Sequence, residues 1–328
     1  MDKLIGAVIA IVTVPLVLVG YIVIAEWAVK RFPQKTADRL RPILWVFPAV
    51  AMLFVFLVYP MIVTVWFSLW NFDPAGVNFT SFAGLENYAT FFTNNDTLTA
   101  LRNNGLWVIL LPLLAVGIGL VIAVLVDRVR YESLVKSVVF LPMAISFVAA
   151  TVIWKLVYDF NPRIGILNAG VDALGGGPIA FIQDSPAWPA PLNTVMLVIV
   201  GTWMLTGFAM VILSAGLKAI PTELLEAARV DGANEWYVFR KVIFPLLLPT
   251  IAVITTTVII FGLKTFDVVY TMTSGNFDTE VIANRMYKEL AVFHEPGRAS
   301  ATAMILLAAI VPVMIYNIRR FREQEEQR

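Results

Sequence analysis

The sequence predicts an all-α fold, a polytopic transmembrane helical bundle with about seven spans. Hydrophobic residues occupy 59% of the 328 positions and charged residues only 14%, and the mean hydropathy is +0.81. A soluble chain of this composition would leave too much apolar surface in water. The apolar runs are also long enough, since about 20 such residues cross the hydrocarbon core of a bilayer. The predicted spans are residues 4–29, 43–70, 105–126, 134–158, 192–217, 246–272 and 299–318.

The first run is expected to remain in the protein as a helix. It starts after a single lysine, Lys3, and no small-residue cleavage site precedes a polar start, so it does not read as a signal peptide. We therefore predict an extra N-terminal transmembrane helix with a cytoplasmic linker over residues 1–42. A core of about six helices follows over 43–318, interrupted by a polar loop over 218–245, and 319–328 form a tail.

Basic residues predict the orientation of the spans, because cytoplasmic loops of membrane proteins are enriched in Lys and Arg. Most basic residues follow the first, third and fifth predicted spans or lie in the tail. They are Lys30, Arg31, Lys35, Arg39, Arg41, Arg128, Arg130, Lys136, Lys218, Arg229, Arg240, Lys241, Arg319, Arg320, Arg322 and Arg328. The alternate segments hold fewer basic residues, so we expect the N-terminus outside and the C-terminus and the loop 218–245 in the cytoplasm.

The sequence lacks the groups that most catalytic and metal sites need. It has no cysteine and a single histidine, His294, which leaves little material for metal ligation or for a catalytic triad. Phosphate-binding loops ending in Gly-Lys-Ser/Thr, His-Glu-x-x-His and Gly-x-Ser-x-Gly are also missing. We therefore predict that the chain is not an enzyme and holds no cofactor, and that any ATP driving it is bound by another polypeptide. The net charge of +1 gives no reason to expect a nucleic-acid partner.

Two pairs of opposite charges lie at the ends of predicted spans. Lys264 and Asp267 stand three apart, and Lys155 and Asp159 stand four apart, so each pair can share a helix face. Charges in a membrane cost free energy unless they are paired or reach the interface. They predict either structural anchors or the lining of a polar path, and the sequence leaves both readings open.

Small, hydroxyl-bearing and aromatic residues recur at spacings of three and four in the fifth and sixth predicted spans. These stripes are Trp203, Thr206, Gly207 and Met210, and Val258, Phe261, Gly262 and Thr265. Close helix packing explains such residues, since small side chains let helices approach. The alternative reading is a translocation path, with aromatic faces and hydroxyls in contact with a solute. The absence of charge at the centre favours a neutral solute.

The predicted outer loops, residues 71–102 and 159–191, are long and irregular. Long loops in a compact protein are often functional, so a partner outside the cell could dock here. Simple capping of helix ends is the alternative reading.

The polar loop carries Glu226-Ala227-Ala228, then Gly232, then Val242-Ile243-Phe244-Pro245. This spacing resembles the signature of the inner-membrane permease subunits of ABC importers, with Val and Phe where the signature has Ile and Leu. Further segments resemble the carbohydrate-uptake branch of that family, closest to its α-glucoside permeases. They include Gly84-Leu-Glu-Asn-Tyr88, Phe140-Leu-Pro-Met143, Thr206-Gly-Phe-Ala-Met-Val-Ile-Leu-Ser214 and Phe266-Asp-Val-Val-Tyr-Thr-Met-Thr-Ser-Gly275.

The resemblance implies a coupling helix that sits in a cleft of a cytoplasmic ATPase subunit. Glu226 would make polar contacts and Gly232 would allow the elbow, within the coupling residues Glu226, Ala227, Ala228, Asp231 and Gly232. The implied partners are a second homologous permease subunit, two cytoplasmic ATP-binding subunits, an extracytoplasmic sugar-binding protein and membrane lipid. The implied location is a bacterial inner (plasma) membrane.

The resemblance further implies a sugar path in the two spans that flank the loop. Alignment with the related maltose permease places these residues at the sugar-lining positions: Leu205, Phe208, Val258, Phe261, Gly262 and Thr265. Gly262 and Thr265 replace amides of the relative, so a different hydrogen-bonding pattern is expected. The implied function is ATP-driven import of an oligosaccharide, an α-glucoside of the maltose or trehalose type.

Three alternatives stay open at this stage. The first is an ABC permease for another neutral or charged solute, such as a polyamine or an amino acid. Acidic residues in the pore spans would favour it, and the central stripes have none. An ion-coupled secondary transporter would need inverted repeats and carboxylates at the membrane midplane, and only Asp267 comes near that description. A membrane-embedded enzyme would need a nucleophile or a metal cluster.

Overall fold

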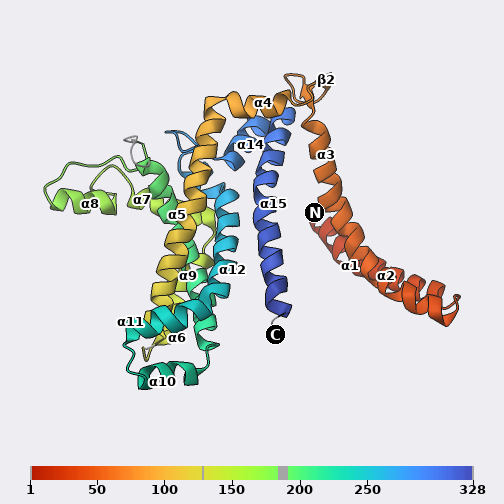
Figure 1. The fold of residues 1–328 in the computed structure, drawn as a ribbon. Coiled ribbons are helices and arrows are strands. Elements are labelled where there is room, and N and C mark those ends of the chain that lie inside the picture. Colours follow the sequence, from red (N-terminus) through yellow and green to blue (C-terminus); the bar gives the residue numbers. More distant parts are fainter. Residues whose placement is uncertain (1, 128, 184–190, 327–328) are drawn as a thin grey trace. The chain divides into compact units, whose positions relative to one another are not determined.

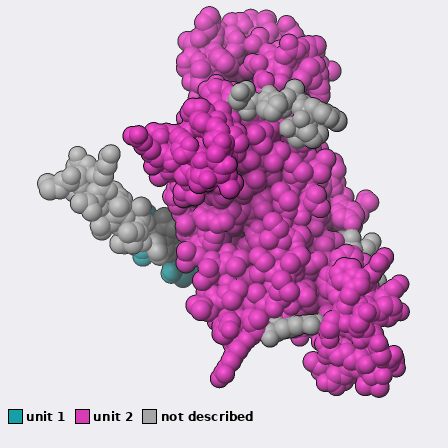
Figure 2. All heavy atoms as spheres, turned by 90° about the vertical axis from the view of Figure 1, so that its left-hand side faces the viewer, with its two compact units in different colours: residues 1–64 teal, residues 65–328 magenta. Residues whose placement is uncertain are grey.

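The computed structural model describes residues 2–127, 129–183 and 191–326. Contacts divide the chain into two compact units, Met1–Thr64 and Val65–Arg328 (Figure 2). The predicted boundary after residue 42 concerns membrane topology rather than contacts, and it stays a prediction. Arg128, Arg328 and the segment 184–190 of the second predicted outer loop lie outside the described residues.

The described residues of the first unit are helical apart from a turn at residues 30–33. It contains α1 (Asp2–Val29), α2 (Gln34–Leu53), a π-helical turn (Phe54–Val58) and most of α3 (Tyr59–Phe67). Pro33 precedes α2 with φ −55°, a value that its ring imposes and that suits a helix start. The hydroxyl of Tyr21 donates to the carbonyl of Leu44 at 2.8 Å, which fastens α1 to α2.

The predicted all-α polytopic bundle is confirmed. Five helices in the described residues are long and apolar enough to cross a membrane: Gln34–Phe67, Asn95–Val126, Leu192–Lys218, Glu235–Leu263 and Pro296–Arg319. A bent helix pair is a sixth candidate, and α1 adds an apolar N-terminal helix. The described strands are β1 (Trp70–Phe72) and β2 (Phe79–Phe82), which form one antiparallel hairpin.

The fourth predicted span is broken rather than straight. It consists of α6 (Glu132–Phe140), a 3₁₀ turn (Leu141–Ala144) and α7 (Phe147–Val157), and the two parts meet at 99°. Pro142 interrupts the hydrogen bonding of α6 because it has no N–H. Ser146 then takes an extended conformation, and its hydroxyl accepts the N–H of Ala149 at 3.2 Å, so it caps the start of α7.

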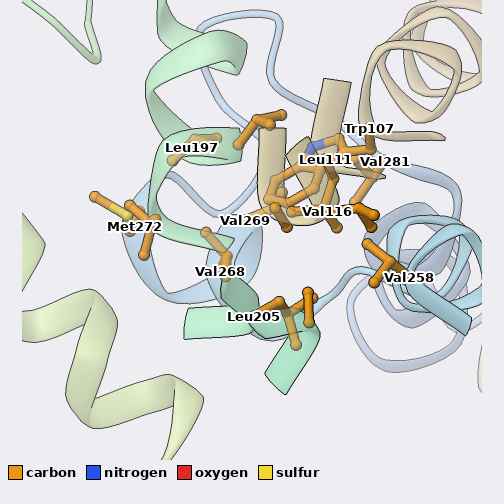
Figure 3. Close-up of a cluster of buried hydrophobic side chains, with 14 of the residues drawn as sticks. Trp107, Leu111, Val116, Leu197, Leu205, Val258, Val268, Val269, Met272 and Val281 are labelled. Carbon is orange, nitrogen blue, oxygen red and sulfur yellow. The ribbon is translucent and has the colours of Figure 1, made fainter. Parts of the chain in front are cut away.

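The core of the second unit lies between two long helices. α5 (Asn95–Val126) and α9 (Leu192–Lys218) pack along each other, and α12 (Phe244–Leu263) packs against both. Their buried side chains form one apolar cluster that includes Trp107, Leu111 and Leu205 (Figure 3). α15 (Pro296–Glu326) packs against α12.

Short elements gather at one end of the second unit, where the sequence predicts irregular loops. The hairpin, α4 (Glu86–Thr93) and α14 (Ile282–Ala291) lie there, with α8 (Ile166–Ala173) to one side (Figure 1). α10 (Thr222–Val230) lies at the opposite end. The two ends therefore differ in build, which matters for any partner that docks on one of them.

Candidate functional site

α10, the central part of the polar loop 218–245, is a short helix on the surface. Glu223 lies in its first turn and Arg229 in its last, so both charges interact favourably with the helix dipole. None of its residues is buried. The side chain of Val230 is 87% exposed and that of Leu224 is 47% exposed, so α10 carries exposed apolar surface.

Gly232 ends this helix in a left-handed conformation. Its φ is +84°, a backbone conformation that costs free energy for residues other than glycine. The N–H of Ala233 donates to the carbonyl of Ala228 at 3.1 Å, and that of Gly232 to the carbonyl of Arg229 at 3.0 Å. These two bonds define a Schellman motif, in which a glycine closes the helix end. The glycine of the sequence motif is therefore a backbone requirement of the elbow.

The next helix begins directly after the elbow. The carboxamide oxygen of Asn234 accepts the N–H of Tyr237 at 2.8 Å and caps α11 (Glu235–Val238). α11 continues through a π-helical turn (Phe239–Ile243) into α12, so Glu235–Leu263 is one candidate span. An ion pair between Arg229 Nε and Glu235 Oε1, at 3.0 Å, joins the two sides of the elbow.

The inner side of the elbow rests on an apolar cluster. Ile220, Val238, Ile243 and Leu247 are its buried members. Ala228 and Leu225 pack against this cluster. α10 therefore has an anchored face and a free face, which fixes its direction relative to α9 and α12.

The predicted coupling residues divide between these two faces. Glu226, Ala227, Asp231 and Gly232 are exposed, whereas Ala228 is only partly exposed and contacts the apolar cluster. A charge cluster lies beside the start of the loop, where Lys218 Nζ is 2.6 Å from Glu132 Oε1. Lys136 also pairs with Glu132, so α6 is tied to the last residue of α9.

A cavity of about 320 Å³ lies between the spans on either side of this loop. α5, α7, α9, α12 and α13 (Asp267–Met272) contribute to its wall. Four aromatic side chains line it: Trp107, Phe147, Phe261 and Phe266. Its volume is at the lower end of the range of small-molecule sites.

Polar side chains line one part of the same cavity. They are Thr257, Lys264, Thr265 and Asp267. α12 ends at Leu263 and α13 starts at Asp267, so Lys264 and Asp267 do not share a helix face as the sequence spacing predicts. No ion pair joins them in the described part of the chain. Lys155 and Asp159 are likewise separated, because α7 ends at Val157.

Asn104 fixes the C-terminal end of α12, directly before the polar cavity residues Lys264 and Thr265. Its carboxamide N–H group donates to the carbonyl of Leu263 at 3.1 Å, and its oxygen accepts the N–H of Ile282 at 2.8 Å. The side chain is 2% exposed. A buried amide satisfied on both sides is well suited to fix neighbouring backbone.

The structure brings together three of the predicted sugar-path residues. Leu205, Phe261 and Thr265 line the cavity. Val258 is fully buried in the apolar cluster, and a Cβ on Gly262 would lie 3.1 Å from the carbonyl oxygen of Trp107. Phe208 is absent from the described wall of this cavity. The roles of all these residues in transport stay predictions.

The stripe in the fifth span lies on another side of α9. Trp203 and Thr206 line a second cavity together with Trp154. Gly207 packs against α6, since a Cβ there would lie 2.7 Å from Cα of Phe140. Met210 is fully buried. Helix packing therefore accounts for Gly207 and Met210.

Sequence reasoning missed several residues of the first cavity, including the aromatic residues Trp107 and Phe147. Each stands in an apolar run, where an aromatic residue reads as core. The pair Asn103-Asn104, one turn before Trp107, is the signal that could have indicated a functional region in α5, because polar residues in a span are commonly functional.

Groups of three or more His, Asp or Glu side chains that could hold a metal are absent from the described residues. The fold and the cavity thus define a class: a multi-pass helical membrane protein with a solute-sized cavity and an exposed helix–elbow–helix. The chain belongs to the family of binding-protein-dependent transport system inner membrane components, which matches residues 115–321. It is therefore the permease subunit of an ABC importer in the inner membrane and not an enzyme. The ATPase subunits and the binding protein of such a system are separate chains.

Curated relatives extend beyond the matched region. The osmoprotective compounds uptake permease protein GgtC of Synechocystis is 47% identical over 289 residues, covering 87% of this chain and 100% of the relative. The alpha-glucoside transport system permease protein AglF of Rhizobium meliloti is 40% identical over 342 residues, covering 97% of each chain.

The fold agrees with a solved importer. A chain of a bacterial ABC transporter involved in the import of the acidic polysaccharide alginate superposes with a TM-score of 0.73 and 22% identity. The match covers 88% of this chain and 98% of that one.

Proposed function

We propose that this chain is one of two homologous permease subunits of an importer for an oligosaccharide, an α-glucoside of the maltose or trehalose type. The observation that carries the proposal is the cavity between α9 and α12, because aromatic and hydroxyl-bearing side chains line it together. Aromatic faces stack on sugar rings, and hydroxyls such as that of Thr265 bond to sugar hydroxyls. The 40% identity with an alpha-glucoside permease supports the choice of sugar.

Coupling would run through the free face of α10. In this proposal Glu226 makes polar contacts in a cleft of a cytoplasmic ATPase subunit, and Leu224 and Val230 supply the exposed apolar area. ATP would close two ATPase subunits on each other and draw the two coupling helices together. The cavity would then open toward an extracytoplasmic sugar-binding protein, as alternating access requires.

The proposed orientation places α10 in the cytoplasm and the N-terminus outside. The chain has no cysteine, so single cysteines report topology without background. Leu224→Cys on α10 and Leu174→Cys, which is 90% exposed beyond α8, form a matched pair. A membrane-impermeant maleimide applied to spheroplasts should label position 174 only. Inverted vesicles stripped of the ATPase subunits, which cover α10 in this proposal, should show labelling of position 224 only. The reverse pattern would contradict the orientation.

A second candidate is an importer for a small osmoprotective solute that carries charge. The 47% identity with an osmoprotective compounds permease supports it. Lys264 and Asp267 also line the same cavity, and one cation and one anion suit a zwitterion better than a neutral sugar.

One experiment separates these proposals. The tagged chain is purified in mild detergent, the proteins that come with it are identified, and the complex is placed in liposomes with its binding protein. ATP hydrolysis and uptake are then measured with maltose, trehalose, glycine betaine and spermidine. Stimulation by maltose or trehalose supports the first proposal, and stimulation by glycine betaine alone supports the second. A chain that purifies without any ATPase would contradict the coupling scheme.

A further inference from the structure

The indole N–H of Trp107 has no hydrogen-bond partner, although the side chain is 1% exposed. Five buried side-chain polar atoms of the described residues lack a partner, and the other four belong to Trp70, Thr194, Thr202 and Asn284. Of these residues, Trp107 is the one that lines the cavity between α9 and α12. A buried donor without an acceptor is unfavourable, so a native structure that keeps one calls for an explanation.

Packing fixes the ring of Trp107 in place. A Cβ on Gly201 would lie 2.9 Å from Cζ3 of the ring, so α9 carries a glycine where the indole rests. The backbone of Trp107 is also closely packed, because a Cβ on Gly262 of α12 would lie 3.1 Å from its carbonyl oxygen. Figure 3 shows Trp107 beside Leu111 in the cluster, with the indole nitrogen in blue. The ring has little freedom to turn toward another acceptor.

The cavity offers other polar groups but none that this N–H uses. Thr257 donates its hydroxyl to the carbonyl of Val253 at 2.9 Å. The carboxylate of Asp267 is an acceptor on the same wall, yet no bond joins it to Trp107 in the described residues. An indole N–H can only donate. A solute that brings an oxygen lone pair into the cavity that Trp107 lines would supply the missing acceptor.

We infer that Trp107 is a solute-binding residue, whose indole N–H donates to a hydroxyl oxygen of an uncharged polyhydroxylated solute in the cavity. The inference rests on the proposed sugar-import function and adds a specificity-determining donor from α5 to the residues of α9 and α12. A site that places a buried donor against a substrate oxygen discriminates strongly against analogues without that oxygen.

The test uses the complete importer in proteoliposomes, with its binding protein at a fixed saturating concentration. kcat/KM for uptake is measured with maltose and with each monodeoxy-maltose, for the wild type, Trp107→Phe and Trp70→Phe. Trp70 is the matched control because its indole N–H is also unpartnered but lies in β1, away from the cavity.

Loss of one hydrogen bond predicts that Trp107→Phe lowers kcat/KM for maltose about 5- to 10-fold. On one deoxy analogue the wild type and Trp107→Phe should be equal, because the bond is already missing. Trp70→Phe should match the wild type on every sugar. If Trp107→Phe does not assemble, 3-benzothienylalanine at position 107 keeps the ring shape and removes the N–H.

The outcomes distinguish the role of Trp107 from the proposed sugar import. An unchanged kcat/KM for the variants at position 107, or the same loss on maltose and on all analogues, would overturn the role of Trp107 while sugar import stands. A wild-type importer that takes up neither maltose nor trehalose would overturn the proposed function and this inference with it.

Discussion

The carboxamide oxygen of Asn104 accepts the backbone N–H of Ile282 at 2.8 Å, across 178 positions of sequence. The same carboxamide donates to the carbonyl of Leu263. One buried side chain on α5 therefore holds the end of α12 and the start of α14. The break between α12 and α13, where Lys264 and Asp267 meet the cavity, depends on this connection.

We expect Asn104→Leu, which keeps the approximate volume and removes every hydrogen bond, to destabilise the protein by about 1–3 kcal/mol. The N–H of Ile282 and the carbonyl of Leu263 would lose their partner without access to water. Thermal unfolding of the purified chain, followed by tryptophan fluorescence, measures the loss. Asn95→Leu is the control, since Asn95 is exposed at the start of the same helix and surface changes stay within about 0.5 kcal/mol. Equal unfolding temperatures for the two variants would refute the bridging role.

Gly232 after α10 and Gly175 after α8 have the same left-handed backbone conformation. Their φ values are +84° and +80°, and a Cβ on either would meet no atom within 4 Å. A valine at each position therefore carries a similar strain, of about 1–2 kcal/mol. Because Gly232 closes the proposed coupling helix, we expect Gly232→Val to lower coupled uptake at least about tenfold. Gly175→Val should retain uptake, and both variants should insert into the membrane. Normal uptake kinetics for Gly232→Val would show that the elbow does not transmit coupling.

The elbow could be predicted from sequence because its determinants are local. Gly232 and the cap Asn234 act on residues within one helical turn, so spacing alone indicates both. The break after Leu263 could not be predicted, since Asn104 fixes it from another helix. Pro142 alone did not reveal the 99° bend, because prolines are tolerated in straight spans when neighbours satisfy the freed carbonyls. The role of Trp107 could not be predicted, because the lack of a hydrogen-bond partner for its N–H is a property of the packed protein and not of the sequence.

Asp73 gives the hairpin β1–β2 a pH dependence. Its carboxylate accepts the N–H of Val77 at 2.8 Å and both the backbone and side-chain N–H of Asn78. These hydrogen bonds, led by that from Val77, hold the pKa of Asp73 below the usual 3.8. The ionised form is favoured in the folded hairpin, so its contribution is fully present above pH 3.8 and is lost as the pH falls through the folded pKa.

We expect amide exchange at Val77 and Asn78, corrected for the intrinsic rate, to be slow at neutral pH and to accelerate only in strong acid. Asp73→Asn should exchange faster at neutral pH and show no further change in acid. Asp172→Asn serves as the control because Asp172 is exposed in α8, on a different loop. Slow exchange that persists in Asp73→Asn would mean that the carboxylate does not hold the turn.

At Gly207 the backbone of α9 lies close against the backbone of α6. A Cβ there would lie 2.7 Å from Cα of Phe140, and backbone atoms cannot move aside as a flexible side chain can. Gly207→Ala should therefore push α6 from α9 and destabilise the isolated chain by about 1–3 kcal/mol. Gly117→Ala is the matched control, because a Cβ at Gly117 in α5 would meet nothing within 4 Å and alanine favours the helix by about 0.5–1 kcal/mol. Thermal unfolding should rank Gly117→Ala at or above the wild type and Gly207→Ala below it.

Because α6 also pairs with Lys218 at the end of α9, a wider α6–α9 spacing should weaken coupled uptake in Gly207→Ala as well. The opposite order of unfolding temperatures would show that this contact is not the constraint that holds the bent helix pair against α9.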